Sequence, residues 1–236
     1  MTRASYGIDA PGVVRANFVS GSAFAVIAAT GARINLIPTW AVAVAAFLAV
    51  LCVFFAAVML HASLVSKKRL CQRLVAALAL GGDECVLDAG CGRGLALIAC
   101  AKKLTTGKAV GIDLWAAQDQ SDNSPNATLA NAAAEGVADR VTVETGDITM
   151  LPFADASFDA VITMTVIHNI PSRDARDQAL RELARVLKPG GRMIVFDLLH
   201  AARYAQVLRA CGLNVETLSR DILWLLPCRS LIARKP

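Results

Sequence analysis

The chain has 236 residues, 56% of them hydrophobic, and a mean hydropathy of +0.51, which is too apolar for a typical soluble domain. Its net charge of +5 is carried by residues 1–73, with seven Lys or Arg and one acidic residue, whereas residues 74–236 hold 17 basic and 18 acidic residues. The excess of positive charge therefore gives no indication of a nucleic-acid partner and suits a segment beside an anionic membrane surface.

The most apolar stretch, residues 40–60, contains no charged residue. A helix of about 20 apolar residues matches the hydrocarbon core of a bilayer, which is about 30 Å thick. A helix that is apolar on every side needs burial all round, and this favours a membrane span over a core helix. A cleaved signal peptide is disfavoured, because the stretch begins far into the chain and is too long.

Residues 16–33 form a weaker candidate for a second span, shorter in its apolar part and interrupted by hydroxyl side chains. Arg15 and Arg33 would lie at its two ends, Pro38 in a tight turn, and Trp40 at the membrane interface. We favour this two-span hairpin over a lone span with an interfacial N-terminal segment.

The orientation of the hairpin follows from the basic residues around it. The positive-inside rule places the basic side in the cytoplasm, and in a hairpin Arg3 and Arg15 lie on that same side. We therefore expect residues 1–66 to be an integral anchor in the cell membrane and residues 67–236 to be a cytoplasmic domain. The basic residues that follow the second span are Lys67, Lys68, Arg69 and Arg73.

Seven cysteines show no CxxC pair and no nearby His at zinc spacing, so we expect free thiols in a reducing cytosol. Past an amphipathic helix over residues 70–80, strands and helices alternate. Short, fully apolar strands alternating with helices predict an α/β fold, with a mainly parallel sheet covered on both faces. Ligands bind such sheets at the carboxyl ends of the strands. The predicted strands are 85–89, 109–113, 140–144, 158–165, 192–197, 213–219 and 230–233, and the predicted helices are 95–104, 126–135, 174–187 (ended by "LKPGG") and 202–211.

Between the first strand and the first helix the chain reads Asp88-Ala89-Gly90-Cys91-Gly92-Arg93-Gly94. A tight strand-to-helix turn needs backbone dihedrals that glycine adopts cheaply, and missing side chains let a ligand approach the main chain. A plain turn without a ligand is the alternative. The dinucleotide fingerprint GxGxxG would need glycine where Leu95 stands, which disfavours a nicotinamide-dependent oxidoreductase.

This D-x-G-x-G-x-G pattern resembles the first motif of class I S-adenosylmethionine-dependent methyltransferases. The stretches "LPFADASFDAVI" and "RVLKPGGRMIVFD" look like the corresponding segments of quinone-biosynthesis methyltransferases and their type-11 relatives, and the resemblance covers Leu70 to Pro236. It implies a Rossmann-like methyltransferase fold with a seven-stranded sheet, and S-adenosylmethionine as the cofactor.

The resemblance also implies roles for particular residues. Asp88 would order the glycine turn and the methionyl amino group, and Asp113 would accept the ribose hydroxyls. Asp147 would contact the adenine amino group, and Ile148 would line the adenine face. Taken singly, Asp113 could be a helix cap and Asp147 a turn residue. The expected cofactor-binding residues are Asp88, Ala89, Gly90, Cys91, Gly92, Gly94, Asp113, Leu114, Asp147, Ile148 and Thr163.

One departure from the family pattern is the long polar segment 115–125, with Trp115, Gln118, Asp119 and Gln120 ahead of the next helix. It either folds over the cofactor or substrate or forms a surface loop, and we favour the loop.

His168 and Asn169, in "VIHNIP" after the fourth strand, are the expected catalytic residues, since family members place acceptor-facing residues there. His168 would serve as a general base or an orienting donor, the alternative being a structural role. His200 is a weaker second candidate, and His61 is expected at the membrane interface. No set of carboxylates and His resembles a metal site, which disfavours a metal-dependent mechanism.

Together these features predict a membrane-anchored S-adenosylmethionine-dependent methyltransferase. Proximity to lipid favours a small lipophilic acceptor such as a quinone or phenol, a lipid amine or an acid, with O-, N- and C-methylation all open. A non-catalytic S-adenosylmethionine-binding sensor or scaffold for a membrane partner is the alternative from another class.

Overall fold

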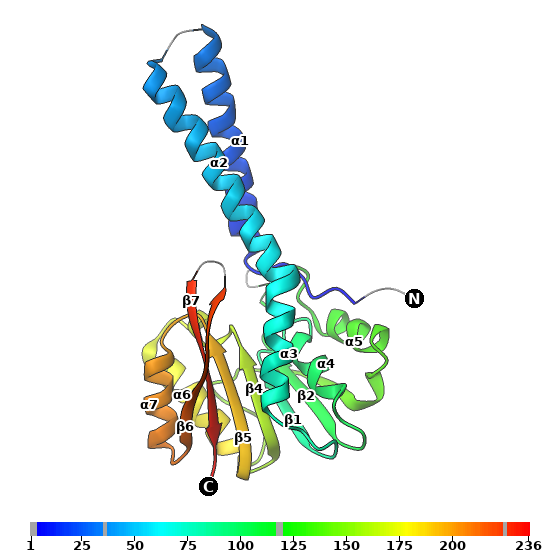
Figure 1. Cartoon of the computed structure of the whole chain (residues 1–236). Coiled ribbons are helices and arrows are strands. Elements are labelled where there is room, and N and C mark those ends of the chain that lie inside the picture. Colours follow the sequence, from blue (N-terminus) through cyan, green and yellow to red (C-terminus); the bar gives the residue numbers. More distant parts are fainter. Residues whose placement is uncertain (1–3, 35–36, 117–119, 224–225) are drawn as a thin grey trace.

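The computed structural model describes residues 4–34, 37–116, 120–223 and 226–236. A long helical hairpin projects from one end of an α/β domain (Figure 1). Arg3, Gln118 and Asp119, named above, lie outside the described residues.

The hairpin consists of α1 (Pro11–Ile34) and α2 (Thr39–His61), which contain the two stretches expected to be membrane spans. Both helices are long and apolar enough to cross a membrane by length and composition. At 1.5 Å per residue each is about 35 Å long, close to the thickness of the hydrocarbon core.

Small residues form the contact between α1 and α2. A Cβ atom on Gly21 would lie 3.2 Å from the Cβ of Cys52, so the two backbones approach closely there. Ala45 and Ala49 of α2 are buried, whereas large side chains such as Phe47 and Val50 point outward and are exposed. Small residues at the contact and large apolar ones outside are typical of helix pairs in lipid.

α2 runs without a break into the domain. It continues through a π-helical turn, η1 (Ala62–Ser66), into α3 (Lys67–Ala77), giving one helix over Thr39–Ala77. The expected boundary between residues 66 and 67 therefore falls within a continuous helix, and no linker separates the hairpin from the domain at this point.

The sheet has seven strands in the order β3-β2-β1-β4-β5-β7-β6. The first five strands are parallel to one another, and β7 is antiparallel to both β5 and β6. β1 lies at the centre of the parallel part, where Val86 pairs with Ala109 on one side and Ala160 on the other. The expected seven-stranded, mainly parallel sheet is confirmed. Its strands are β1 (Cys85–Ala89), β2 (Lys108–Asp113), β3 (Val141–Thr145), β4 (Phe158–Met164), β5 (Leu187–Asp197), β6 (Asn214–Leu223) and β7 (Leu226–Arg234).

Helices cover both faces of the sheet (Figure 1). Successive residues of a strand point to opposite faces, so Val86 joins the core beneath α3 and α4, and Leu87 joins the core beneath α6 and α7. Hydroxyl caps start two helices: Ser124 accepts a hydrogen bond from the Ala127 amide and Ser172 from that of Ala175. The remaining helices are α4 (Leu95–Ala101), α5 (Pro125–Ala134), η2 (Ala138–Arg140), η3 (Ile167–Asn169), α6 (Arg173–Val186) and α7 (Ala201–Ala210).

The last three strands are longer than expected. β5 begins at Leu187, so "LKPGG" lies within the strand, and Gly190 donates its amide hydrogen to the carbonyl of Lys235. The expected strands were limited to apolar runs, whereas antiparallel pairing continues through polar residues at the edge of the sheet. β6 and β7 consequently form a long hairpin.

Candidate active site

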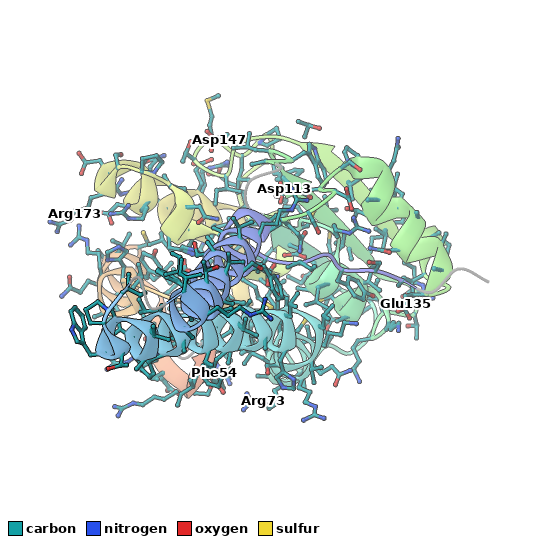
Figure 2. All side chains as sticks on the ribbon, turned by 90° about the horizontal axis from the view of Figure 1, so that it is seen from above. Phe54, Arg73, Asp113, Glu135, Asp147 and Arg173 are labelled. Atoms are coloured by element: carbon teal, nitrogen blue, oxygen red, sulfur yellow. The ribbon has the colours of Figure 1, made fainter. Side chains whose placement is uncertain are left out.

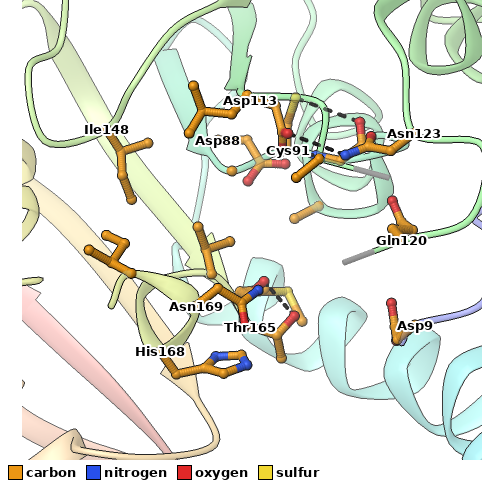
Figure 3. A pocket seen from close by; sticks show the side chains of 18 of the residues that line it. Asp9, Asp88, Cys91, Asp113, Gln120, Asn123, Ile148, Thr165, His168 and Asn169 are labelled. Carbon is orange, nitrogen blue, oxygen red and sulfur yellow. Dashed lines mark hydrogen bonds between the residues drawn. The ribbon is translucent and has the colours of Figure 1, made fainter. Parts of the chain in front are cut away.

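A cavity of about 750 Å³ lies at the carboxyl ends of the parallel strands, within the usual size range of small-molecule sites. Figure 3 shows Asp88, Cys91 and Asp113 across this cavity from His168 and Asn169. Cofactor and acceptor candidates thus face each other. The expected site residues that line it are Asp88, Gly90, Cys91, Gly92, Asp113, Leu114, Asp147, Ile148, His168 and Asn169.

Three expected cofactor residues, Ala89, Gly94 and Thr163, are not among those that line the cavity. Ala89 and Thr163 are fully buried within β1 and β4. Gly94 caps α4, where an added Cβ would lie 2.8 Å from Cγ2 of Thr128. These residues support the cavity walls without lining the cavity.

The glycine turn is tight, with φ of +78° at Gly90 and +50° at Gly92. Added Cβ atoms would lie 2.3 Å from Cγ2 of Val166 at Gly90, and 2.6 Å from Oε1 of Gln120 at Gly92. The glycines therefore let two other segments of the chain close over the turn, in addition to leaving its backbone at the cavity wall.

Asp113, at the end of β2, holds this turn. One carboxylate oxygen accepts the Gly92 amide at 2.8 Å, and the other accepts the amide of Trp115 at 2.6 Å and the side chain of Asn123 at 3.3 Å. A carboxylate offers about four acceptor positions, so capacity remains for a ligand hydroxyl.

Asp88 is fully buried at the end of β1, and its Oδ2 atom has no hydrogen-bond partner. Burial raises its pKa to about 7, and the charge of nearby Asp113 acts in the same direction. A buried, unsatisfied carboxylate at a cavity wall suits a cationic ligand group.

Two more buried acceptor atoms without partners belong to cavity-lining residues, Oδ2 of Asp9 and Oδ1 of Asn123. Asp147, after β3, is exposed at the cavity and accepts the Thr149 amide, with Ile148 buried beside it. The site is therefore rich in acceptors. Such a site fits S-adenosylmethionine, which carries a sulfonium, an amino group, ribose hydroxyls and an adenine amino group.

His168 is paired with a buried carboxylate that was not foreseen. Its Nδ1 atom is hydrogen-bonded to Oδ1 of Asp197, and its backbone amide donates to Oδ2 of the same residue at 2.9 Å. Asp197 ends β5 and also accepts the Leu198 amide at 2.8 Å and the hydroxyl of Tyr204 at 3.3 Å. This arrangement orients the imidazole and leaves Nε2 on the other side of the ring.

The end of the hairpin that joins the domain forms a third side of the cavity. Asp9 and Ala10, just ahead of α1, and Lys67, at the start of α3, all line it. Lys67 and Asp9 form a buried ion pair, with Nζ 2.7 Å from Oδ1. Both chain segments that enter the hairpin are thereby joined at the site.

Residues 4–9, here called the N-terminal strap, cross the domain to reach this point. Asn131 of α5 bonds the Ser5 backbone in both directions, at 2.9 and 2.8 Å, and the side-chain amide of Gln120 donates to the carbonyl of Tyr6 at 2.9 Å. Ser121 and Ile8 are linked by two further hydrogen bonds.

The polar segment after β2 is therefore more than a surface loop. Gln120 is buried at the cavity, and its Oε1 accepts the Arg93 amide at 2.8 Å. Ala116 and Asn123 also line the cavity. The interpretation of residues 115–125 as a surface loop was wrong for the described part of this segment, because the strap packs it against the glycine turn.

His200, the weaker catalytic candidate, and His61, expected at the membrane interface, do not line the cavity. His200 is exposed at the start of α7, beside Tyr204, and His61 is exposed at the end of α2. Within the part of the chain that the structure describes, no group of three or more His, Cys, Asp or Glu could hold a metal ion.

Sequence reasoning missed Asp197, Gln120, Asp9 and Lys67. Asp197 had a signal, since it ends an apolar parallel strand, the place where such folds bind ligands. Asp9 and Lys67 had none, because only the closure of the hairpin brings them together.

Comparisons with known proteins identify similar methyltransferases. The family described as a methyltransferase domain matches residues 87–195. The methyltransferase GfsG of Streptomyces halstedii is 34% identical over 132 residues, covering 56% of this chain and 44% of that protein. A demethylmenaquinone methyltransferase of Lactiplantibacillus plantarum is 35% identical over 129 residues, covering 53% of this chain and 50% of that protein. The chain thus spans about half the length of the curated relatives it matches.

A solved S-adenosylmethionine-dependent methyltransferase from Aquifex aeolicus shares the fold, with a TM-score of 0.54 at 19% identity, covering 69% of this chain and 88% of that one. The fold is that of the class I S-adenosylmethionine-dependent methyltransferases. Within this fold, residues 87–195 are the part that matches the methyltransferase domain.

Proposed function

We propose that this chain is an integral membrane methyltransferase that faces the cytoplasm and methylates a small lipophilic acceptor whose reacting atom gives up a proton. The observation that carries the proposal is one cavity that combines the acceptor-rich cofactor wall, the His168–Asp197 pair and the root of two apolar helices. The L. plantarum relative is named for a demethylated quinone, which agrees with a lipophilic acceptor.

Each cofactor-facing residue has a definite task. Asp88 would hold the methionyl amino group, Asp113 the ribose hydroxyls while it keeps the glycine turn in shape, and Asp147 the adenine amino group. When bound, S-adenosylmethionine supplies an electrophilic methyl group on a sulfonium. The protein contributes position, charge complementarity and exclusion of water.

The acceptor would lie between this wall and His168. With Nδ1 donating to Asp197, Nε2 is the basic nitrogen and takes the proton from the acceptor as its nucleophilic atom attacks. The buried Asp197 carboxylate stabilises the imidazolium that results. Asn169, exposed at the same edge, would orient the acceptor by a hydrogen bond. Such a base is most useful when the acceptor is a phenol, another acidic hydroxyl or the carbon of an enol.

Methyl transfer is tested with the whole chain in lipid nanodiscs, tritium-labelled S-adenosylmethionine and total bacterial lipid extract. We expect label in the organic phase with wild type, and a loss of about 100-fold or more in His168→Gln, the size of effect associated with a general base. Calorimetry should show unchanged cofactor affinity in that variant. Cofactor binding without transfer to any extract would instead support the sensor or scaffold role.

A further inference from the structure

Large apolar side chains stand exposed around the mouth of the cavity. Leu114, Met150, Leu199 and Ile222 have 63, 78, 53 and 74% of their surface exposed. Met150, Leu199 and Ile222, here called the apolar rim, do not line the cavity itself. Binding of the cofactor therefore does not explain why these side chains are exposed.

The topology places the first two rim residues at the edge where the cavity opens. Met150 follows the cavity-lining Thr149 in the loop after β3, and Leu199 follows the cavity-lining Leu198 after β5. β3 and β5 belong to the parallel part of the sheet, so their carboxyl ends share one edge.

Ile222 reaches the same edge from the antiparallel hairpin. Arg229 of β7 pairs with Asp197, the last residue of β5, so the earlier residues of β7 project beyond that end. Ile222 pairs with Pro227 in this projecting part. Its neighbour Asp221 binds Arg73 of α3 at 2.6 Å, which ties the tip of the hairpin to the long helix.

The helical hairpin leaves the domain from this edge as well. Asp9 and Ala10 line the cavity directly ahead of α1, and Lys67 lines it directly after η1. Figure 1 shows β6 and β7 extending toward the side from which α1 and α2 project, and Figure 2, seen from that side, shows Asp113 near α1.

Two connections join the hairpin to the domain near the rim. The helix over Thr39–Ala77 is continuous, and the buried Lys67–Asp9 ion pair fixes the start of α1 to it. A bilayer that surrounds α1 and α2 therefore ends close to the rim and the cavity mouth.

We propose that the apolar rim rests in the interface of the bilayer that holds the hairpin, and that the methyl acceptor enters the cavity from the lipid. This inference rests on the membrane anchoring proposed above and adds a route and a substrate class, a membrane-resident lipid. An acceptor that passes this way never exposes its apolar body to water, a step that becomes more costly with every methylene group. Arg173, exposed at the start of α6, and Lys68 and Arg69 of α3 supply positive charge that suits anionic headgroups.

Contact between rim and lipid is tested with the unmodified full chain in phosphatidylethanolamine–phosphatidylglycerol vesicles that contain a phospholipid with a photoreactive diazirine near the glycerol end of an acyl chain. After irradiation, peptide mass spectrometry locates the lipid adducts. We expect adducts at Met150, Leu199 and Ile222 as well as on the hairpin. Leu129 on α5 and Leu218 in the middle of β6, also exposed leucines, serve as controls and should stay unlabelled.

Two results would overturn the inference. One of them would contradict only the contact between rim and bilayer, and the other would also contradict the membrane anchoring. Adducts on the hairpin with no more at the rim than at Leu129 and Leu218 would contradict bilayer contact and leave the anchor in place. The absence of adducts on the hairpin would contradict the membrane anchoring itself.

Entry from lipid is tested by placing the total lipid extract either in the vesicles that hold the enzyme or in separate vesicles, with tritium-labelled S-adenosylmethionine outside. We expect at least tenfold faster initial labelling when extract and enzyme share a vesicle. The triple variant Met150→Gln/Leu199→Gln/Ile222→Gln should lose most of that advantage, whereas Leu218→Gln should keep it. Equal rates in the two arrangements would overturn the route, and no labelling in either would contradict methyl transfer to a membrane lipid.

Discussion

With Asp88 as the proposed partner of a cationic ligand group, cofactor binding should depend on pH, because burial raises the pKa of its carboxyl to about 7 and such a group needs the ionised form. We expect S-adenosylmethionine affinity to rise about tenfold between pH 6 and pH 8, as the ionised fraction grows through that pKa. Calorimetry across this range measures it, and Asp88→Asn should bind weakly with a flat profile. A wild-type affinity that does not change with pH would contradict this role.

The same carboxyl affects stability with the opposite sign. Its pKa is about 7 in the folded protein and about 3.9 in an unfolded chain, so the folded state binds the proton more tightly. The free energy of unfolding of the ligand-free protein should therefore fall as pH rises from about 4 through about 7. Asp88→Asn should lack this component in urea unfolding curves. An equal slope in the variant would argue against Asp88 as its source.

Asp197 should act through His168 and not on the cofactor. Asp197→Asn keeps the shape but removes the charge that favours Nδ1–H and the imidazolium, so we expect kcat to fall by about 100-fold or more with cofactor affinity unchanged. Tyr204→Phe, which removes only the hydroxyl donor at 3.3 Å, is the matched variant and should have a much smaller effect. Equal losses in both would point to a structural role for the whole cluster.

At the scale of elements, the helical hairpin depends on close packing at Gly21. Gly21→Leu would place a side chain where the Cβ alone lies 3.2 Å from the Cβ of Cys52. Overpacking of this kind costs about 1–3 kcal/mol, so we expect the helices to separate more often and Cys52 to be alkylated several-fold faster in detergent. Ala25→Leu, on the exposed side of α1, is the control and should match wild type.

The N-terminal strap depends on the ion pair between Lys67 and Asp9. Lys67→Met leaves a buried carboxylate unpaired, a change that costs about 3–5 kcal/mol in buried pairs. We expect faster hydrogen exchange over Ser5–Asp9 and weaker cofactor binding, because the strap holds the segment that covers the glycine turn. Adding Asp9→Asn removes the unpaired charge and should restore much of the protection. A double variant no better protected than Lys67→Met would contradict this account.

At the scale of the molecule, the proposed two spans would place both termini on one side of the membrane. Epitope tags at the N-terminus and at the C-terminus should both be accessible in inverted vesicles from expressing bacteria and both protected in spheroplasts. A lone span would expose the two tags on opposite sides. In the two-span arrangement, Arg33 at the far end of α1 would lie on the outer side of the membrane.

Periodicity and the positions of glycines were enough to predict the seven strands and a mainly parallel sheet, and the resemblance to class I methyltransferases supplied most of the residues at the cavity wall. Local sequence patterns indicate which residues are buried and where the chain turns. β1, the glycine turn and Asp113 are also close together in sequence. The part that could not be predicted depends on contacts over long distances. Asp9 meets Lys67 only through the hairpin, and Gln120 reaches the glycine turn only because the strap holds it there.

The central claim is most directly tested by calorimetric binding of S-adenosylmethionine and S-adenosylhomocysteine to the whole chain in nanodiscs, beside Asp113→Ala. We predict micromolar binding of both ligands by the wild-type protein. The variant should bind at least tenfold more weakly, since a hydrogen bond to a charged group contributes about 1.5–3 kcal/mol. Folded wild-type protein that binds neither ligand, or an Asp113→Ala variant that binds both as tightly, would contradict the assignment of this cavity.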